Sequence, residues 1–122
     1  MSKVLVIEDR PDVAELIEVV LEEEGFDVAV AYDGKSGLEK FREDRPDLVL
    51  LDLILPDIHG FDVFQQMQAI DAEVPIVMLT GQARLSDRRT GIELGAEEYL
   101  VKPFASDELV KKVRAILDRQ DK

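Results

Sequence analysis

The chain contains no cysteine, so no disulfide framework can hold it together, and this composition suits a reducing compartment. Long apolar runs are also missing. The longest mainly apolar stretch, residues 74–79, falls far short of the roughly 20 residues that a membrane helix needs. The apolar residues 4–7 are too few for the centre of a signal peptide. We therefore expect a cytoplasmic domain that neither enters a membrane nor is exported.

Positive charge is scarce as well, because 15 Lys and Arg residues stand against 27 Asp and Glu and give a net charge of -12. Such a chain repels phosphate backbones, so we expect no direct nucleic-acid binding by this domain. The positive residues gather in the last third, where solvated helix faces are their ordinary explanation. Those residues are Arg84, Arg88, Arg89, Lys111, Lys112, Arg114 and Arg119.

A chain of 122 residues is long enough for one domain, which buries roughly two-thirds of its unfolded surface. We expect residues 1–122 to form a single domain, since no repeat or linker interrupts them. The chain ends within a turn of its last expected helix. The alternative is a piece cut from a longer protein after about residue 118.

Short apolar segments alternate with helical patterns along the whole chain. Apolar residues at i, i+3, i+4, i+7 and i+8 predict the first helix, and Gly25 follows its end. That stripe is Val13, Leu16, Ile17, Val20 and Leu21. The other expected helices cover residues 33–44, the stretch after Gly60, residues 85–94 and a last segment that buries residues between 109 and 117. The expected strands are residues 4–7, 27–31, 48–52, 76–79 and 98–101.

Five strand-then-helix units with short links predict an α/β domain with a parallel sheet and helices on both faces. We expect a flavodoxin-like, doubly wound (βα)5 sandwich with strand order 2-1-3-4-5. In this order the first and third strands are neighbours, and ligands enter beyond their carboxyl ends.

Residues with reactive side chains stand where these strands end. Glu8 and Asp9 follow the first strand, Asp52 ends the third, Thr80 follows the fourth and Lys102 follows the fifth. Because the carboxyl ends of parallel strands share one edge of the sheet, we expect these five side chains to converge.

Acids brought together in this way need a partner. Two carboxylates about 4 Å apart repel by about 1 kcal/mol in water and about 4 kcal/mol in a partly buried site, so three acids need a cation or a shared proton. An acid-only site suits Mg2+. If the ion also held a phosphoryl group, Lys102 could neutralise one of its oxygens, the Thr80 hydroxyl could donate to another, and Gly81 would leave room.

Taken singly, these residues have ordinary explanations. An acid pair after one strand is usually a solvated turn, Lys102 has a surface alternative, and Thr80 suits a strand interior. Asp52 is harder to explain away, because apolar neighbours on both sides would make its burial costly without a partner. One fold places all of them on the same edge, which strengthens the combined interpretation.

Four motifs are similar to those of a known family. They are VIED at residues 6–9, LDLILPDIHG at 51–60, LTG at 79–81 and GAEEYLVKPF at 95–104. From Lys3 to about Leu117 the chain resembles a receiver domain of the response-regulator family of two-component signalling, which is CheY-like. Together the motifs are highly specific.

The resemblance implies that Asp52 accepts a phosphoryl group from a histidine of a partner kinase or a phosphotransfer protein. It implies Mg2+ held by Asp9, Asp52 and the backbone carbonyl of Ile54, with Glu8 acting mainly through the waters of the metal. Lys102 would then bind the phosphoryl group.

By the same resemblance, Thr80 moves to hydrogen-bond the phosphoryl group and Tyr99 swings inward as its switch partner. A half-buried Tyr99 with a wet hydroxyl is the alternative. The bond between Lys102 and Pro103 is expected to be cis, which costs only about 0.5 to 1 kcal/mol.

In the family, the side chains at the positions of Ile54 and Gln82 tune the access of hydrolytic water. Ile54 cannot orient water, so we expect a longer phosphoryl lifetime than with an amide at this position. His59 is expected to be a solvated loop residue without a functional role.

We therefore expect a signalling switch that catalyses its own phosphorylation and dephosphorylation and is not a turnover enzyme. Its modification would change partner binding or dimerisation through the face of the fourth helix, fifth strand and fifth helix. A receiver-like interaction module without phosphotransfer is one alternative. A small Mg-dependent aspartyl phosphatase is another, although such enzymes commonly need an acid where Ile54 stands.

Overall fold

Strands and helices alternate through the described part of the chain, a computed structural model covering residues 2–81 and 95–120. The strands are β1 (Lys3–Ile7), β2 (Asp27–Ala31), β3 (Leu48–Asp52), β4 (Ile76–Thr80) and β5 (Glu98–Val101). The helices are α1 (Pro11–Glu23), α2 (Gly34–Glu43), α3 (Gly60–Ile70) and α5 (Ser106–Gln120). The helix expected at 85–94 and Gln82 lie outside the described residues.

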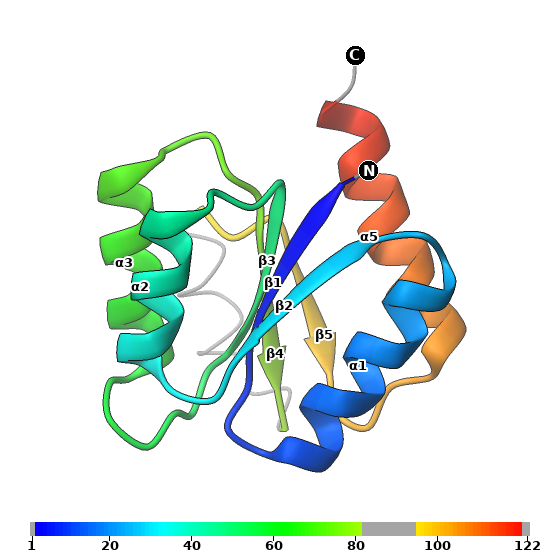
Figure 1. The fold of residues 1–122 in the computed structure, drawn as a ribbon, viewed down its shortest axis with the longest axis horizontal. Helices are drawn as coiled ribbons and strands as arrows, with labels where there is room; N and C mark the ends of the chain where they lie inside the picture. The colour runs from blue at the N-terminus through cyan, green and yellow to red at the C-terminus, as the bar shows by residue number, and fades with distance from the viewer. Residues whose placement is uncertain (1, 82–94, 121–122) are drawn as a thin grey trace.

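The strands form one five-stranded parallel sheet in the order β2-β1-β3-β4-β5 (Figure 1). This order and the α/β class confirm the fold that the strand and helix pattern predicts. The register pairs Ile7 with Leu51, and Asp52 with Leu79. The carboxyl ends of β1, β3 and β4 are therefore level, which brings the residues that follow them to one edge.

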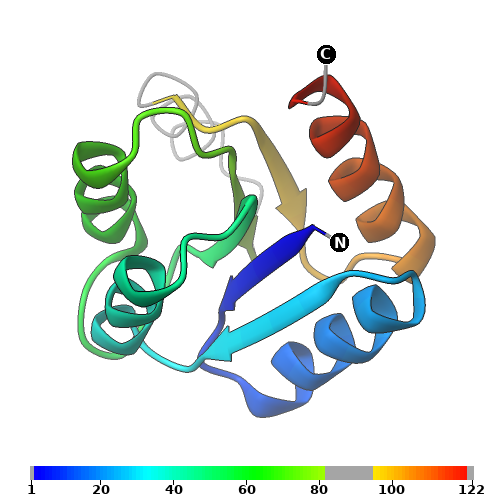
Figure 2. The same ribbon diagram turned by 45° about the horizontal axis from the view of Figure 1, so that its top comes forward.

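Helices cover both faces of this sheet, with α2 and α3 on one side and α1 and α5 on the other (Figures 1 and 2). Successive strand residues point to opposite faces. Leu5 and Ile7 accordingly belong to the core under α2 and α3, whereas Val4 and Val6 belong to the core under α1 and α5. Burial on both faces explains the apolar runs of the central strands β3 and β4, whereas the edge strand β2 is exposed at alternate positions.

The ends of the helices follow from local sequence. Proline at the first position of α1 costs no hydrogen bond there, because that N–H has no partner within the helix. Gly25, just beyond α1, has a φ of 93°, which favours glycine. His59 caps α3, since its Nδ1 accepts a hydrogen bond from Phe61 N at 3.2 Å. The expectation that His59 is only a solvated loop residue therefore missed this structural role.

The apolar stripe of α1 is only partly buried. Ala14, Ile17 and Leu21 form its buried face, while Leu16 remains 51% exposed although the periodicity places it on the stripe. Among the described residues, no helix is both long and apolar enough to cross a membrane.

Candidate functional site

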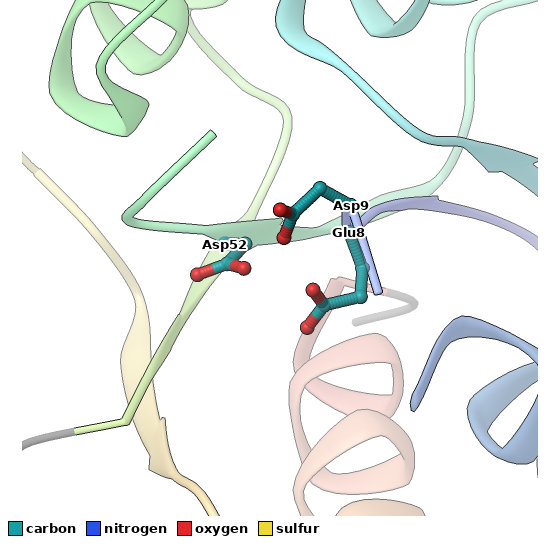
Figure 3. Close-up of side chains that lie close together, drawn as sticks. All are labelled: Glu8, Asp9 and Asp52. Atoms are coloured by element: carbon teal, nitrogen blue, oxygen red, sulfur yellow. The ribbon is translucent and has the colours of Figure 1, made fainter. Parts of the chain in front are cut away.

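Carboxylates meet at the carboxyl edge of the sheet, between β1 and β3. Glu8 and Asp9 follow β1, and Asp52 is the last residue of β3. One carboxylate oxygen from each lies within 4.8 Å of the others. Figure 3 shows the carboxylates turned toward a common space. The structure thus brings together the acids that the strand ends suggest.

The acids differ in exposure. Glu8 is fully buried and Asp52 is 5% exposed, whereas Asp9 is exposed. Burial raises the pKa of Glu8, hydrogen bonding from Lys102 opposes this, and the neighbouring Asp52 adds to it; the net effect is a raised pKa. A positive charge placed nearby would therefore stabilise the buried carboxylates of Glu8 and Asp52.

Lys102 supplies positive charge to this cluster from within the fold. Its Nζ forms ion pairs with Glu8 and, at 3.1 Å, with Asp52 Oδ2. Burial alone would lower the pKa of Lys102, but its pairing with Glu8 and Asp52 outweighs that effect and leaves the pKa raised. The lysine follows β5, and its peptide bond to Pro103 is cis.

One lysine does not balance the acids. Glu8, Asp9 and Asp52 carry three negative charges against the single charge of Lys102 when all are ionised. All of these donor atoms are carboxylate oxygens. Mg2+ and Ca2+ prefer oxygen ligands, whereas zinc sites typically contain nitrogen or sulfur ligands. The residues present therefore fit a small divalent cation.

Thr80 and Tyr99 lie on β4 and β5, the next two strands of the sheet beyond β3. Thr80 ends β4 and is 3% exposed, and Tyr99 on β5 is 4% exposed. The Tyr99 ring packs in the core under α2 and α3, so the half-buried alternative is wrong for this structure. From α5, Lys112 Nζ donates to the Tyr99 backbone oxygen at 2.7 Å.

The loop after Asp52 turns tightly back on the strand. Gly60 N donates to Leu53 O at 2.8 Å, and a Cβ on Gly60 would lie 2.5 Å from the Asp52 carbonyl oxygen. Within the loop, Ile54 N donates to Asp52 Oδ1 at 3.1 Å. Ile54 is 66% exposed, so its side chain is not packed in the core.

A hollow of about 340 Å³ opens beside Lys102. Its walls include Arg10, Val13, Leu16 and Phe104. Sequence reasoning did not assign Arg10 or Leu16 to the site, although the apolar stripe carried a signal for Leu16. Of the charged side chains in the acid cluster, Lys102 is the one that also lines this hollow.

The positive residues of α5 do not form one surface. Arg114 pairs with Glu24 at 2.8 Å and lies over the ring of Phe26, on the side of α1. Lys112 instead faces β5, where its Nζ lies 3.8 Å from Glu98 Oε1. Arg114 therefore contacts the α1 side of α5 and not the face that α5 shares with β5.

A doubly wound parallel sheet with acids, a threonine and a lysine at its carboxyl edge defines a class of α/β domains whose ligand site lies beyond the carboxyl ends of the strands. Residues 4–114 match the response regulator receiver domain family. The chain belongs to this family, and it is thus a receiver domain of two-component signalling.

Relatives of known name support the assignment. The chain is 50% identical over 120 residues to the DNA-binding response regulator MtrA of Mycolicibacterium smegmatis, covering 98% of this chain and 52% of that protein. It is 42% identical to the response regulator ArlR of Staphylococcus saprophyticus, covering 98% of this chain and 54% of that protein. The chain thus spans about half the length of these relatives.

Solved structures agree. A CheY-like receiver domain protein from Methanospirillum hungatei superposes with a TM-score of 0.95 at 27% identity, covering 99% of this chain and 97% of that one. The receiver domain of the Francisella response regulator 1452 gives 0.92 at 29% identity, covering 98% and 99%.

Proposed function

We propose that this domain is a phosphorylation-dependent switch in which Asp52 accepts a phosphoryl group from a histidine kinase or a phosphotransfer protein. The observation that carries the proposal is the buried Asp52 carboxylate, held 3.1 Å from Lys102 Nζ and clustered with Glu8 and Asp9. An aspartate carboxylate of this kind can act as the nucleophile of a covalent group transfer.

Mg2+ is the proposed cofactor, bound by Asp9, Asp52 and the backbone carbonyl of Ile54, with Glu8 acting through coordinated water. When bound, the ion would offset the acid repulsion and draw charge from a phosphoryl oxygen. Its fit rests on the all-oxygen donor set and on the excess negative charge of the cluster.

In the proposed transfer, an Asp52 carboxylate oxygen forms a bond to phosphorus while the bond from phosphorus to the donor histidine nitrogen breaks. The electron pair of that bond stays on the imidazole, which takes up a proton from solvent. Lys102 Nζ lies beside Asp52 and can stabilise charge on the transferred group, and the Thr80 hydroxyl can donate to another oxygen. Positioning and charge, more than proton transfer, would supply the catalysis.

Hydrolysis of the acyl phosphate would complete the cycle. Water must attack phosphorus and displace the Asp52 oxygen. Ile54, which is 66% exposed, has no polar atom in its side chain with which to orient that water. We therefore propose a longer phosphoryl lifetime than with an amide at position 54. Gln82, the other proposed tuning residue, lies outside the described residues.

The signal is proposed to leave through Thr80 and Tyr99 toward β5 and α5, and to change partner binding or dimerisation there. Both side chains are buried on the adjacent strands β4 and β5, so a shift of either one would require its closely packed surroundings to rearrange. The single-domain extent of residues 1–122, the cytoplasmic location and the lack of nucleic-acid contact by this domain stay predictions.

An aspartyl phosphatase is the less favoured function. It would need a general acid two residues beyond the nucleophile, and Ile54 stands there. An interaction module without phosphotransfer would have no need for a buried acid cluster of this cost.

Intact mass spectrometry after incubation with acetyl phosphate and Mg2+ tests the proposal. The wild type should gain the mass of one phosphoryl group, Asp52→Asn should gain none, and Asp71→Asn should behave like the wild type. Asp71 is a suitable control because it lies in the turn after α3, where it accepts a hydrogen bond from Glu73 N. Equal labelling of Asp52→Asn would refute the assignment.

A further inference from the structure

Asp57 lies in the loop that connects β3 to α3, but its side chain forms hydrogen bonds to a different helix, α2. Its Oδ1 accepts a hydrogen bond from Gly34 N at 2.8 Å, and its Oδ2 accepts one from Lys35 N at 3.0 Å. Oδ1 also accepts from Ile58 N at 2.9 Å. One carboxylate thus joins the β3–α3 loop to the first turn of α2, and α2 and α3 begin at the same end of the domain (Figure 1).

These bonds go beyond ordinary capping of α2. The helix has its own cap, because Asp33 Oδ1 accepts from Ser36 N at 2.7 Å. Asp57 accepts hydrogen bonds from Gly34 N and Lys35 N, the two N–H groups of the first turn that Asp33 does not bind. It lies more than twenty residues away in the sequence. A carboxylate at a helix N-terminus is also favoured by the helix dipole. The hydrogen bonds from Gly34 and Lys35 lower the pKa of Asp57, as expected for a carboxylate held in its charged form.

Close packing reinforces the connection. A Cβ on Gly34 would lie 2.9 Å from Val63 Cγ2 and 3.3 Å from Asp57 Oδ1. The start of α2 therefore approaches both α3 and the loop more closely than a larger residue would allow. The hydrogen bonds of Asp57 therefore join elements that are already in contact, and they fix the position of the loop relative to α2.

Ile54 depends on such anchors. Its side chain is 66% exposed, so packing in the core does not hold it. At its start the loop is held by Ile54 N donating to Asp52 Oδ1, and Gly60 N, donating to Leu53 O, links the two ends of the loop. Three residues beyond Ile54, Asp57 is the next side chain of the loop with hydrogen bonds to a different element.

We propose that Asp57 is a positioning residue, which through its hydrogen bonds to α2 fixes the β3–α3 loop and so keeps the Ile54 carbonyl where it completes the divalent-cation site. This inference rests on the proposed function, since it takes the Ile54 carbonyl as a ligand. Groups that orient metal ligands in this way typically change metal affinity by about 10- to 100-fold when they are removed.

Titration calorimetry with Mg2+ alone tests the inference on the wild type, Asp57→Ala, Asp57→Asn and the control Asp71→Asn. Melting curves in EDTA first define a temperature at which every variant is folded. Asp57→Ala should bind Mg2+ about tenfold more weakly than the wild type. Asp57→Asn keeps one oxygen acceptor and should fall between them, and Asp71→Asn should match the wild type.

The pair of Asp57 variants separates position from charge. Both lose the same negative charge, but only asparagine can still accept a hydrogen bond from α2. Equal losses in the two variants would show a charge effect and overturn the inference, as would wild-type affinity in Asp57→Ala. If Asp57→Ala does not fold, Mg2+ binding by Asp57→Asn and Asp71→Asn is compared at a salt concentration that screens charge. Weaker binding by Asp57→Asn supports the inference, and equal binding by the two variants overturns it.

Failure of the proposed function gives a different result. In that case the wild type itself would not bind Mg2+, or Asp52→Asn would bind it as tightly as the wild type. Wild-type binding that depends on Asp52 but not on Asp57 would refute only the role of Asp57.

Discussion

Replacing Asp52 by asparagine should make the domain more stable than the wild type when divalent ions are absent. When Mg2+ is present, the wild type should be the more stable of the two proteins. The carboxylate stands beside two other acids, with an oxygen of each within 4.8 Å, and beside one lysine at 3.1 Å. Asparagine has nearly the same shape, removes one negative charge and keeps an oxygen that can accept from Lys102. The substitution therefore changes charge with little change in packing.

The magnitude follows from these distances. At the 4.8 Å limit within which the carboxylate oxygens lie, each acid repels Asp52 by about 3.5 kcal/mol at an effective dielectric of about 20, and by about 1 kcal/mol in water; a shorter separation raises both values. At 3.1 Å Lys102 attracts it by about 5 kcal/mol and about 1.3 kcal/mol under the same two conditions. Repulsion exceeds attraction in both cases, by about 0.5 to 1.5 kcal/mol. Asp52→Asn should gain about that much stability.

Thermal unfolding followed by circular dichroism at pH 7 measures the effect. In EDTA the variant should melt about 3 to 5 °C above the wild type for each kcal/mol gained. Mg2+ at about 100 times its dissociation constant should then stabilise the wild type by about 2.7 kcal/mol. The variant, having lost a ligand, should gain much less, and Asp71→Asn should follow the wild type. A variant that is less stable in EDTA, or equal Mg2+ stabilisation of both proteins, contradicts this reasoning.

Three further results are expected. Gly60→Ala should lose about 2 to 3 kcal/mol in urea unfolding, because the new Cβ would lie 2.5 Å from the Asp52 carbonyl oxygen; an unchanged midpoint would show that the loop relaxes freely. Ile54→Asn should shorten the lifetime of the phosphorylated protein severalfold, as measured by the decay of the phosphorylated mass, and slower decay would count against the role of position 54. Since the pKa of Asp57 is lowered in the folded protein, the stability advantage of wild type over Asp57→Asn should be present above about pH 4 and disappear as the pH falls through the lowered pKa. Denaturant unfolding in EDTA between pH 6 and pH 3 checks this, and a gap that does not change with pH would argue against it.

The sheet and the acid cluster were predictable because a few local rules decide them. Short apolar segments between helical patterns define buried parallel strands, and a parallel sheet aligns its carboxyl ends. Glu8, Asp9 and Asp52 each follow directly from that rule, since every one stands at a strand end. Their proximity therefore needed no knowledge of side-chain packing.

Other features depended on three-dimensional detail. Leu16 is half exposed, although the periodicity of its apolar stripe alone predicts burial. The stripe is wider than the face of α1 that packs against the sheet. Arg114 pairs with Glu24 across ninety residues, and Asp57 binds α2 across more than twenty. Such contacts link surface residues of ordinary composition, and no local pattern in the sequence distinguishes them.

The central claim is that Asp52 carries the phosphoryl group. Reduction of the phosphorylated protein with borohydride converts an aspartyl phosphate to homoserine, and tandem mass spectrometry of the digest then locates it. We expect homoserine at position 52 alone, formed only when Mg2+ and a phosphodonor are both supplied. Homoserine at any other aspartate, with Asp52 unmodified, would contradict it.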